Sequence, residues 1–200
     1  CFGITRMSNG NLLIGSAIGA KVYTASGNLV QSIGPNENAY GVGTDGANLY
    51  TAVGNTIKKY SAAGSALGTL STSSPIYQME YRNGVMYTSG DSLGGRYGTF
   101  STASFSGYAV STVTNMSSGF RSEGISLSHG NVRYLTGMFG GSASITRIQN
   151  GTIGLSSFGA GILGGPLGTA IVIAPEPGSM LILGAGIAAM AAKKRKRAHK

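Results

Sequence analysis

Tyr23-Thr24-Ala25-Ser26-Gly27-Asn28-Leu29 is matched, 37 residues later, by Tyr60-Ser61-Ala62-Ala63-Gly64-Ser65-Ala66. In each stretch an aromatic residue ends an apolar segment, small residues with a glycine follow, and another apolar segment begins. The glycines keep the same offset as the tyrosines. An offset shared by both ends of a segment is typical of an internal structural repeat.

The same offset holds on the N-terminal side of these stretches. Leu13, Tyr50 and Tyr87 are successively 37 residues apart. Each follows a turn-like segment: Asn9-Gly10-Asn11-Leu12, Asp45-Gly46-Ala47-Asn48-Leu49 and Asn83-Gly84-Val85-Met86. Asn-Gly and Asp-Gly pairs tolerate the positive φ that a type I′ turn needs at both central residues. We therefore expect a hairpin with such a turn in each unit.

Two further units follow the first two. The third is predicted from Ile76 to about Val113, with Phe100 in the place of Tyr23 and Ser101-Thr102-Ala103-Ser104-Phe105 as its turn. The fourth is predicted to begin near Ile125, with a turn in 129–134 and a later strand at 145–148. Strands and turns alternate in the same order in every unit, which predicts a four-stranded meander.

Composition agrees with an all-β body. The chain has 34 glycines and only 10% charged residues, and no segment before residue 174 sustains the 3.6-residue spacing of an amphipathic helix. Four-stranded units of about 40 residues have the size of β-propeller blades. The body resembles propellers of the NHL and YVTN type over about residues 2–155. The alternative is a β-sandwich or an irregular β-solenoid.

The body is assigned to residues 1–155, and 156–173 is a Gly-rich linker or a last strand. No secretory signal precedes Phe2, so we expect the body to be truncated at its N-terminus; a processed lipoprotein beginning at Cys1 is the alternative. Because Cys1 is the single cysteine, no intramolecular disulfide can form.

The C-terminal segment 174–200 has three parts in order. Pro175, Glu176 and Pro177 come first, then fourteen uncharged residues from Ser179 to Ala192, then a basic run. The basic run, which we expect to set membrane orientation, consists of Lys193, Lys194, Arg195, Lys196 and Arg197. A helix of fourteen residues rises about 21 Å, less than the roughly 30 Å hydrocarbon core. Basic side chains can extend its span and stay on the cytoplasmic side, so the segment predicts a single transmembrane helix with the body outside.

The charge of the chain also belongs to this tail. Six of the 15 Lys and Arg residues lie in 193–200. The rest of the chain contains nine basic and six acidic residues, which gives it a net charge of +3. We therefore expect no nucleic-acid partner. The alternative is a nucleic-acid-binding protein that uses the tail, and its affinity would fall steeply with salt.

The order of Pro175-Glu176-Pro177, apolar segment and basic run is similar to the PEP-CTERM sorting signal. This resemblance implies an envelope protein of a Gram-negative bacterium, held transiently in the inner membrane. It also implies an exosortase as partner, which reads the tripeptide and directs the body to the cell surface or outside the cell.

Catalytic motifs are missing from the sequence, which contains no GxSxG, HExxH, paired-cysteine or Walker pattern. The side chains available for chemistry are His129, Asp45, Asp91, Glu37, Glu80 and Glu123. Asp45 is expected to accept a backbone hydrogen bond in its turn, and the loops at Gly94-Gly95-Arg96 and Gly140-Gly141 to bridge strands. We expect no enzyme activity, no cofactor and no metal site.

The ten tyrosines allow a face that stacks on extracellular polysaccharide. Tyr23, Tyr50, Tyr60 and Tyr87 nevertheless recur at repeat positions, which favours packing. The function expected is a noncatalytic surface or extracellular-matrix protein, active in adhesion or biofilm assembly. The alternative is a propeller-type carbohydrate-binding module or enzyme whose active residues lie in missing N-terminal blades.

Overall fold

The computed structural model describes residues 2–90, 96–113, 121–127, 132–139, 142–149 and 152–153. The chain divides into two compact units, Cys1–Ala170 and Ile171–Lys200. Every described residue belongs to the first unit. In this part of the chain the regular elements are all β-strands, as the composition predicted.

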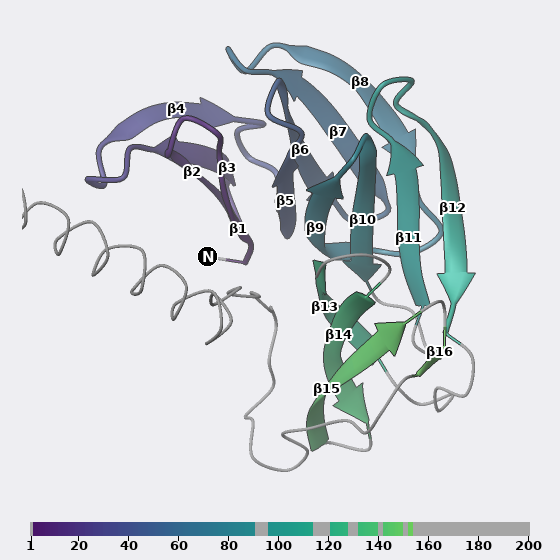
Figure 1. The fold of residues 1–200 in the computed structure, drawn as a ribbon. Coiled ribbons are helices and arrows are strands. Elements are labelled where there is room, and N and C mark those ends of the chain that lie inside the picture. The colour runs from purple at the N-terminus through teal and green to yellow at the C-terminus, as the bar shows by residue number, and fades with distance from the viewer. Residues whose placement is uncertain are drawn as a thin grey trace, which may run out of the picture. The chain divides into compact units, whose positions relative to one another are not determined.

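The strands form four antiparallel sheets (Figure 1). Sheet 1 contains β1 (Ile4–Arg6), β2 (Leu12–Ser16), β3 (Gly19–Tyr23) and β4 (Leu29–Ile33). Sheet 2 contains β5 (Gly41–Thr44), β6 (Asn48–Val53), β7 (Thr56–Ser61) and β8 (Ala66–Ser71). Sheet 3 contains β9 (Ile76–Arg82), β10 (Val85–Gly90), β11 (Arg96–Ser101) and β12 (Ser106–Thr112). Sheet 4 contains β13 (Arg121–Leu127), β14 (Val132–Phe139), β15 (Ser142–Gln149) and β16 (Thr152–Ile153).

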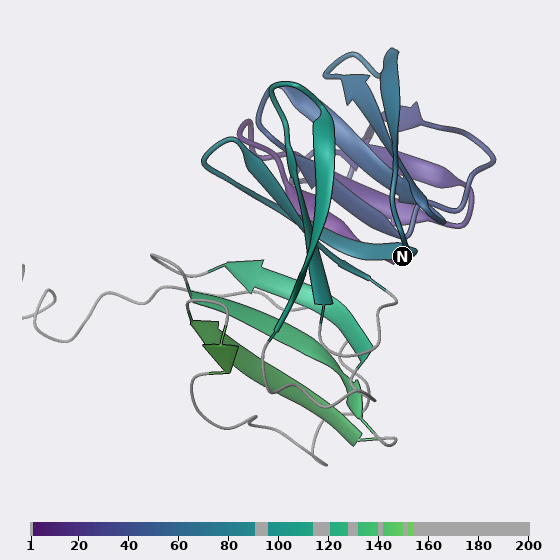
Figure 2. The same cartoon turned by 90° about the vertical axis from the view of Figure 1, so that its right-hand side faces the viewer.

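Each sheet is a meander in which every strand pairs with the next one in sequence. The first strands of successive sheets contact one another, β1 with β5, β5 with β9, and β9 with β13. The first strand of a sheet is therefore its inner strand. Exposure to solvent is lowest in the inner strand and highest in the fourth. The inner strand β5 is largely buried, whereas the fourth strands β8 and β12 consist of exposed and half-buried residues. Figure 2 shows the stacking of the sheets from the side. This is the arrangement of propeller blades.

The core lies between neighbouring sheets. Leu13, Val22 and Ile33 of sheet 1 cluster with Leu49 and Tyr60 of sheet 2. The next layer joins Tyr50, Ala52 and Ile57 of sheet 2 to Met79, Met86 and Phe100 of sheet 3. A third layer contains Tyr97, Val113, Ile125 and Leu127. Full burial of each large apolar side chain contributes about 1.5–3 kcal/mol, so these layers hold the sheets together.

Strand register confirms the repeat and its third copy. Tyr23 pairs with Leu12, Tyr60 with Leu49, and Phe100 with Met86. Phe100 therefore occupies the position of the two tyrosines, as predicted for the third unit. Gly27 and Gly64 have φ values of 87° and 85°, and each donates its N–H to the carbonyl three residues earlier. These two turns are equivalent in structure as well as in sequence.

Among the three units whose first turn is described, the expected type I′ turn occurs in one. Asn83 and Gly84 have φ values of 49° and 82°, and they form a two-residue connection between the paired Arg82 and Val85. At the first turns of the other two units, Gly10 and Gly46 have positive φ, but the preceding Asn9 and Asp45 do not. The prediction was wrong at these two turns because their connections are longer than two residues, so a single left-handed glycine reverses the chain.

The fourth sheet also begins earlier than expected, at Arg121 instead of near Ile125. Of the turn predicted at 129–134, residues 129–131 lie outside the described part of the chain. Residues 132–134 belong to β14 and not to a turn, so the prediction was wrong there. The predicted later strand at 145–148 falls inside β15. The segment 156–173, predicted as a Gly-rich linker or a last strand, lies outside the described part of the chain.

Candidate functional site

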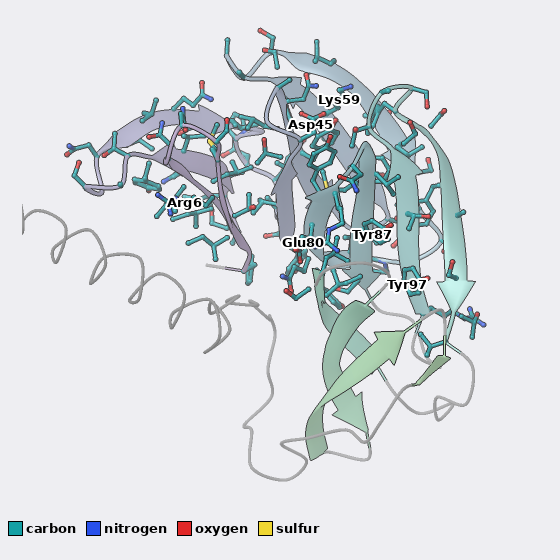
Figure 3. The ribbon with its side chains drawn as sticks, viewed as in Figure 1. Arg6, Asp45, Lys59, Glu80, Tyr87 and Tyr97 are labelled. Atoms are coloured by element: carbon teal, nitrogen blue, oxygen red, sulfur yellow. The ribbon has the colours of Figure 1, made fainter. Side chains whose placement is uncertain are left out.

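A pocket of about 350 Å³ lies where the inner strands of sheets 1, 2 and 3 end. Most of its lining residues are of polar type, and they come from three successive repeats: Thr5, Arg6, Ser8, Thr44, Asp45, Gly46, Glu80 and Tyr81. Figure 3 labels Arg6 of β1, Asp45 in the turn after β5, and Glu80 of β9. Small-molecule sites in proteins have volumes of about 300–1,000 Å³, so the pocket can hold a small ligand.

The repeat places these residues together. Arg6 is the last residue of β1, Thr44 is the last of β5, and Tyr81 is the penultimate residue of β9. Because the inner strands of neighbouring sheets lie side by side, their corresponding ends and the turns after them meet. The pocket therefore draws on the same part of each repeat.

Asp45 is fixed by its turn. Its Oδ1 accepts hydrogen bonds from the N–H groups of Ala47 at 2.9 Å and Asn48 at 2.6 Å, and its Oδ2 accepts one from the Tyr50 hydroxyl at 2.6 Å. Burial alone raises the pKa of Asp45, but these hydrogen bonds outweigh it and hold the pKa below its ordinary value. The predicted backbone-accepting role of Asp45 is confirmed. Such a carboxylate stays ionised and is poorly suited to transfer a proton.

Glu80 connects sheets 3 and 4. Its Oε2 accepts a hydrogen bond from the Leu127 N–H at 3.0 Å, and the neighbouring Gln78 Oε1 accepts one from the Ile125 N–H at 3.2 Å. Burial raises the pKa of Glu80 above its ordinary value, although the bonds from Leu127 and Ser126 and the charge of Arg82 act in the opposite direction. A carboxyl with a raised pKa in a pocket is a candidate general acid, but here it also holds the β13 backbone.

Hydroxyl groups and one aromatic ring complete the lining. Thr44 Oγ1 donates to the Asn48 carbonyl at 2.8 Å and accepts from the Gly46 N–H at 3.1 Å. The Tyr81 hydroxyl accepts from the Gly84 N–H at 3.1 Å, and its side chain is 39% exposed. Arg6 at the end of β1 is also exposed. Donors and acceptors around an exposed ring suit a small polyhydroxylated ligand better than an apolar one.

Among the other chemistry-bearing residues, Glu37 is described and does not line the pocket. The Glu37 carboxylate pairs with Lys58 at the surface. His129 and Asp91 lie outside the described residues, as do Gly94, Gly95 and the Gly140-Gly141 pair, while Arg96 begins β11. Glu123 lies within β13. Within the described ranges, no group of three His, Cys, Asp or Glu side chains is arranged to hold a metal ion.

The recurrent tyrosines divide into two groups. Tyr50 and Tyr60 are 0% and 6% exposed, which confirms packing. Tyr23 and Tyr87 are half-buried, and Tyr87 stacks on Tyr97 with ring centroids 6.5 Å apart. The pocket's aromatic residue is instead Tyr81, which sequence reasoning did not single out. Its only sequence signal is its place just before the Asn83-Gly84 turn.

The family described as the PEP-CTERM protein-sorting motif matches residues 174–196. The chain thus carries this motif at its C-terminal end, where the sequence predicted it. The residues Pro175, Glu176 and Pro177, the apolar segment and the basic run lie outside the described part of the structure. In the described part, no helix has the length and apolar character needed to cross a membrane. A search of the curated proteins finds no match to this sequence.

Solved structures that resemble the chain include propellers. The WD40 repeats of RRP9 align with a TM-score of 0.57 and 15% identity, over 76% of this chain and 47% of that one. The β-propeller domain of Cps50 (Swd1) from Myceliophteria thermophila gives 0.56 and 12%, over 76% and 54%. The computationally designed Ika8 protein gives 0.53 and 12%, over 77% and 47%. The chain thus spans about half the length of these structures, and its four-stranded sheets are propeller-like blades.

Proposed function

We propose that this chain is a noncatalytic envelope protein whose propeller-like body is exported, anchored in the inner membrane by its C-terminal segment and sorted to the cell surface by an exosortase. The observation that carries the proposal is the PEP-CTERM match at residues 174–196. Within it, Pro175-Glu176-Pro177 is the recognition element. The basic run from Lys193 keeps its end of the apolar segment in the cytoplasm.

Three features of the body support a binding or scaffolding role. The blade-like sheets pack against each other through apolar layers. This packing gives the body a rigid surface that suits recognition of a partner. Both carboxylates of the pocket are hydrogen-bonded to the backbone, which favours a structural task for them. The low charge outside the tail favours a partner other than nucleic acid. The matching task is adhesion or assembly of extracellular matrix, as in a biofilm.

The sorting proposal is tested by replacing Pro175, Glu176 and Pro177 with alanine in a chain that carries an epitope in the body. The unaltered chain should be shortened and reach the cell surface, while the variant should stay at full mass in the inner membrane. Pro166→Ala, in the Gly-rich stretch before the motif, is the matched control and should be processed normally. Normal processing of the triple variant would refute the assignment.

A second candidate function is the binding of a carbohydrate in the pocket of sheets 1–3. The specific observation that favours it is the exposed Tyr81 ring beside Arg6, the hydroxyls and two carboxylates. An aromatic ring can stack on a sugar face while the polar groups bond to its hydroxyls.

A glycan array followed by calorimetric titration tests this candidate. Arg6→Ala and Tyr81→Ala should each weaken binding, while Val110→Ala should not, since Val110 on β12 is as exposed as Tyr81 (41% against 39%) but lies away from the pocket. Binding that survives both pocket substitutions would eliminate the pocket as the site. An enzyme would instead turn over the glycan that it binds, which mass spectrometry of the recovered glycan detects.

A further inference from the structure

Three aromatic side chains share one repeat position at the start of the inner strands: Phe2, Tyr40 and Tyr77, which we call the aromatic row. Each lies two residues before the inner-strand residue that pairs with a fixed position of the second strand. These pairs are Ile4 with Ile14, Val42 with Thr51, and Met79 with Thr88, and the second-strand partners are successively 37 residues apart. The repeat therefore puts an aromatic ring at the same place in three neighbouring sheets.

The three rings contact one another in order. The Phe2 and Tyr40 centroids are 4.7 Å apart with the ring planes tilted by 39°, and the Tyr40 and Tyr77 centroids are 6.0 Å apart with the planes at 82°. Aromatic pairs prefer such offset or edge-to-face arrangements, at centroid distances of about 4.5–7 Å. The rings therefore form a continuous row that crosses sheets 1, 2 and 3.

A glycine after each of the first two aromatic residues lets the inner strands come this close. A Cβ at Gly3 would lie 2.8 Å from the Tyr40 carbonyl oxygen, and one at Gly41 would lie 3.2 Å from the Tyr77 carbonyl carbon. Side chains at these two positions would push the starts of the inner strands apart and separate the rings. The row is therefore built into the repeat.

Tyr40 and Tyr77 keep part of their surface open although their sheets have a neighbour on each side. Sheet 2 contacts sheets 1 and 3, and sheet 3 contacts sheets 2 and 4, yet both tyrosines are only half-buried. Tyr50 and Tyr60, in the core of sheet 2, are 0% and 6% exposed. Core packing therefore does not account for the rings of the row, which lie at the opposite ends of the inner strands from the pocket.

The surroundings of the row offer no free charge. The stretches 2–3, 38–41 and 75–78 contain no Asp, Glu, Lys or Arg, and the exposed Asn38 adds an amide two residues before Tyr40. Glu37, which precedes Asn38, is neutralised by its ion pair with Lys58. A charged ligand would find no complementary charge here, so a neutral ligand fits the row best.

We propose that the aromatic row binds a neutral polysaccharide of equatorially linked pyranose units, such as a β-glucan. The C–H faces of such sugars are apolar and stack on aromatic rings, while the hydroxyls at their rim bond to phenol and amide groups. A polymer presents the same unit at regular intervals, as the row presents a ring in each repeat. The use of this site outside the cell rests on the proposed export of the body, but its binding chemistry does not.

Calorimetric titration of the full 200-residue chain with cellohexaose, a soluble oligomer of β-linked glucose, tests the assignment. The detergent that keeps the C-terminal apolar segment in solution must lack a sugar headgroup, which would compete for the rings. Tyr40→Leu and Tyr77→Leu keep an apolar side chain but remove the flat ring, so each should raise the dissociation constant by about tenfold. Tyr40→Phe and Tyr77→Phe keep the ring and should stay within about threefold of wild type.

Two further variants separate the row from core packing and from the pocket. Phe2→Leu removes a ring that is 42% exposed, so it should weaken binding without changing the melting temperature, even where leucine at 40 or 77 destabilises the fold. Tyr81→Ala is the matched control, since Tyr81 is 39% exposed and lines the pocket at the other end of β9. It should leave the binding of cellohexaose unchanged.

Failure of the wild-type chain to bind at about millimolar cellohexaose would overturn the assignment. So would binding that withstands leucine at all three positions of the row, or binding that only Tyr81→Ala removes, which would place the sugar in the pocket. An oligogalacturonate of matched length should bind more weakly, and a tighter, salt-sensitive complex with it would overturn the neutral class of ligand. Each of these outcomes is independent of processing at Pro175-Glu176-Pro177.

Discussion

The Tyr50 hydroxyl donates a hydrogen bond of 2.6 Å to Asp45 Oδ2, which ties a buried core side chain to the turn that borders the pocket. Tyr50 is 0% exposed and packs against Phe100 and Phe105, with ring centroids 5.8 Å away in both cases. Asp45 in turn holds the N–H groups of Ala47 and Asn48. Pocket geometry and core packing are therefore coupled through one hydroxyl.

Removing that hydroxyl should cost stability without opening a cavity. Tyr50→Phe keeps the ring and leaves a partly buried carboxylate with one bond fewer, so we expect unfolding to require about 1–2 kcal/mol less free energy. Tyr23→Phe is the control because Tyr23 is half-buried at the end of β3, and its change should stay within about 0.5 kcal/mol. Urea unfolding at neutral pH measures both. Equal stability of Tyr50→Phe and wild type would show that the bond makes no net contribution.

The same bond predicts a pH dependence. Because the net pKa of Asp45 is lowered in the folded state, its ionised form favours folding. This contribution is fully present above the ordinary aspartate pKa of about 3.9 and is lost as the pH falls through the folded value. The deficit of Tyr50→Phe should therefore be largest above about pH 5 and shrink at lower pH. Urea midpoints at pH 7 and pH 3 measure the change, and a deficit that grows on acidification would contradict it.

The repeat made the strands predictable, but it did not predict the pocket. A 37-residue offset relates Tyr23 to Tyr60, but Phe100 lies 40 residues after Tyr60, so it could be assigned to their position only from the small-residue turn Ser101-Thr102-Ala103-Ser104 that follows it. The pocket depends on which strand of a meander lies innermost, and Arg6, Asp45 and Glu80 share no local pattern that reveals this. Turn type depended on connection length: Asn83-Gly84 has two residues to reverse the chain, whereas Asp45 caps a longer turn.

Gly84 allows a test of the turn itself. Its φ is +82°, and a Cβ added there would meet nothing within 4 Å, so only backbone conformation opposes a side chain. Gly84→Ala should therefore cost about 1–2 kcal/mol. Gly68→Ala in β8 is the matched control, because its added Cβ would lie in ordinary contact with Phe105 at 3.5 Å and its φ is not positive. It should be neutral or stabilising by about 0.5–1 kcal/mol. Thermal unfolding of both variants measures the two changes in stability. Equal losses of stability would argue against backbone conformation as the cause.

Two substitutions of Glu80 distinguish the contribution of its hydrogen bond from the cost of burying its charge. Because burial raises the pKa of Glu80 in the folded state, its ionised form opposes folding, and this cost develops as the pH rises from about 4.3 through the folded value. Glu80→Gln keeps an acceptor for the Leu127 N–H without the charge. It should match or exceed wild-type stability at pH 7 and lose that advantage below about pH 4.

Glu80→Leu removes the acceptor as well and leaves the N–H of Leu127, a residue only 5% exposed, without its partner, which should cost about 1–3 kcal/mol. Glu37→Gln is the control for loss of a carboxylate, since its pair with Lys58 is about a third exposed on both sides and such pairs contribute at most about 1 kcal/mol. Urea unfolding of the three variants at pH 7 and pH 4 tests the order. If Gln and Leu at position 80 were equally destabilising, the carboxylate charge would be what holds β13 against β9. If Leu were harmless, the contact between β9 and β13 would rest on Ile125 and Leu127 packing alone.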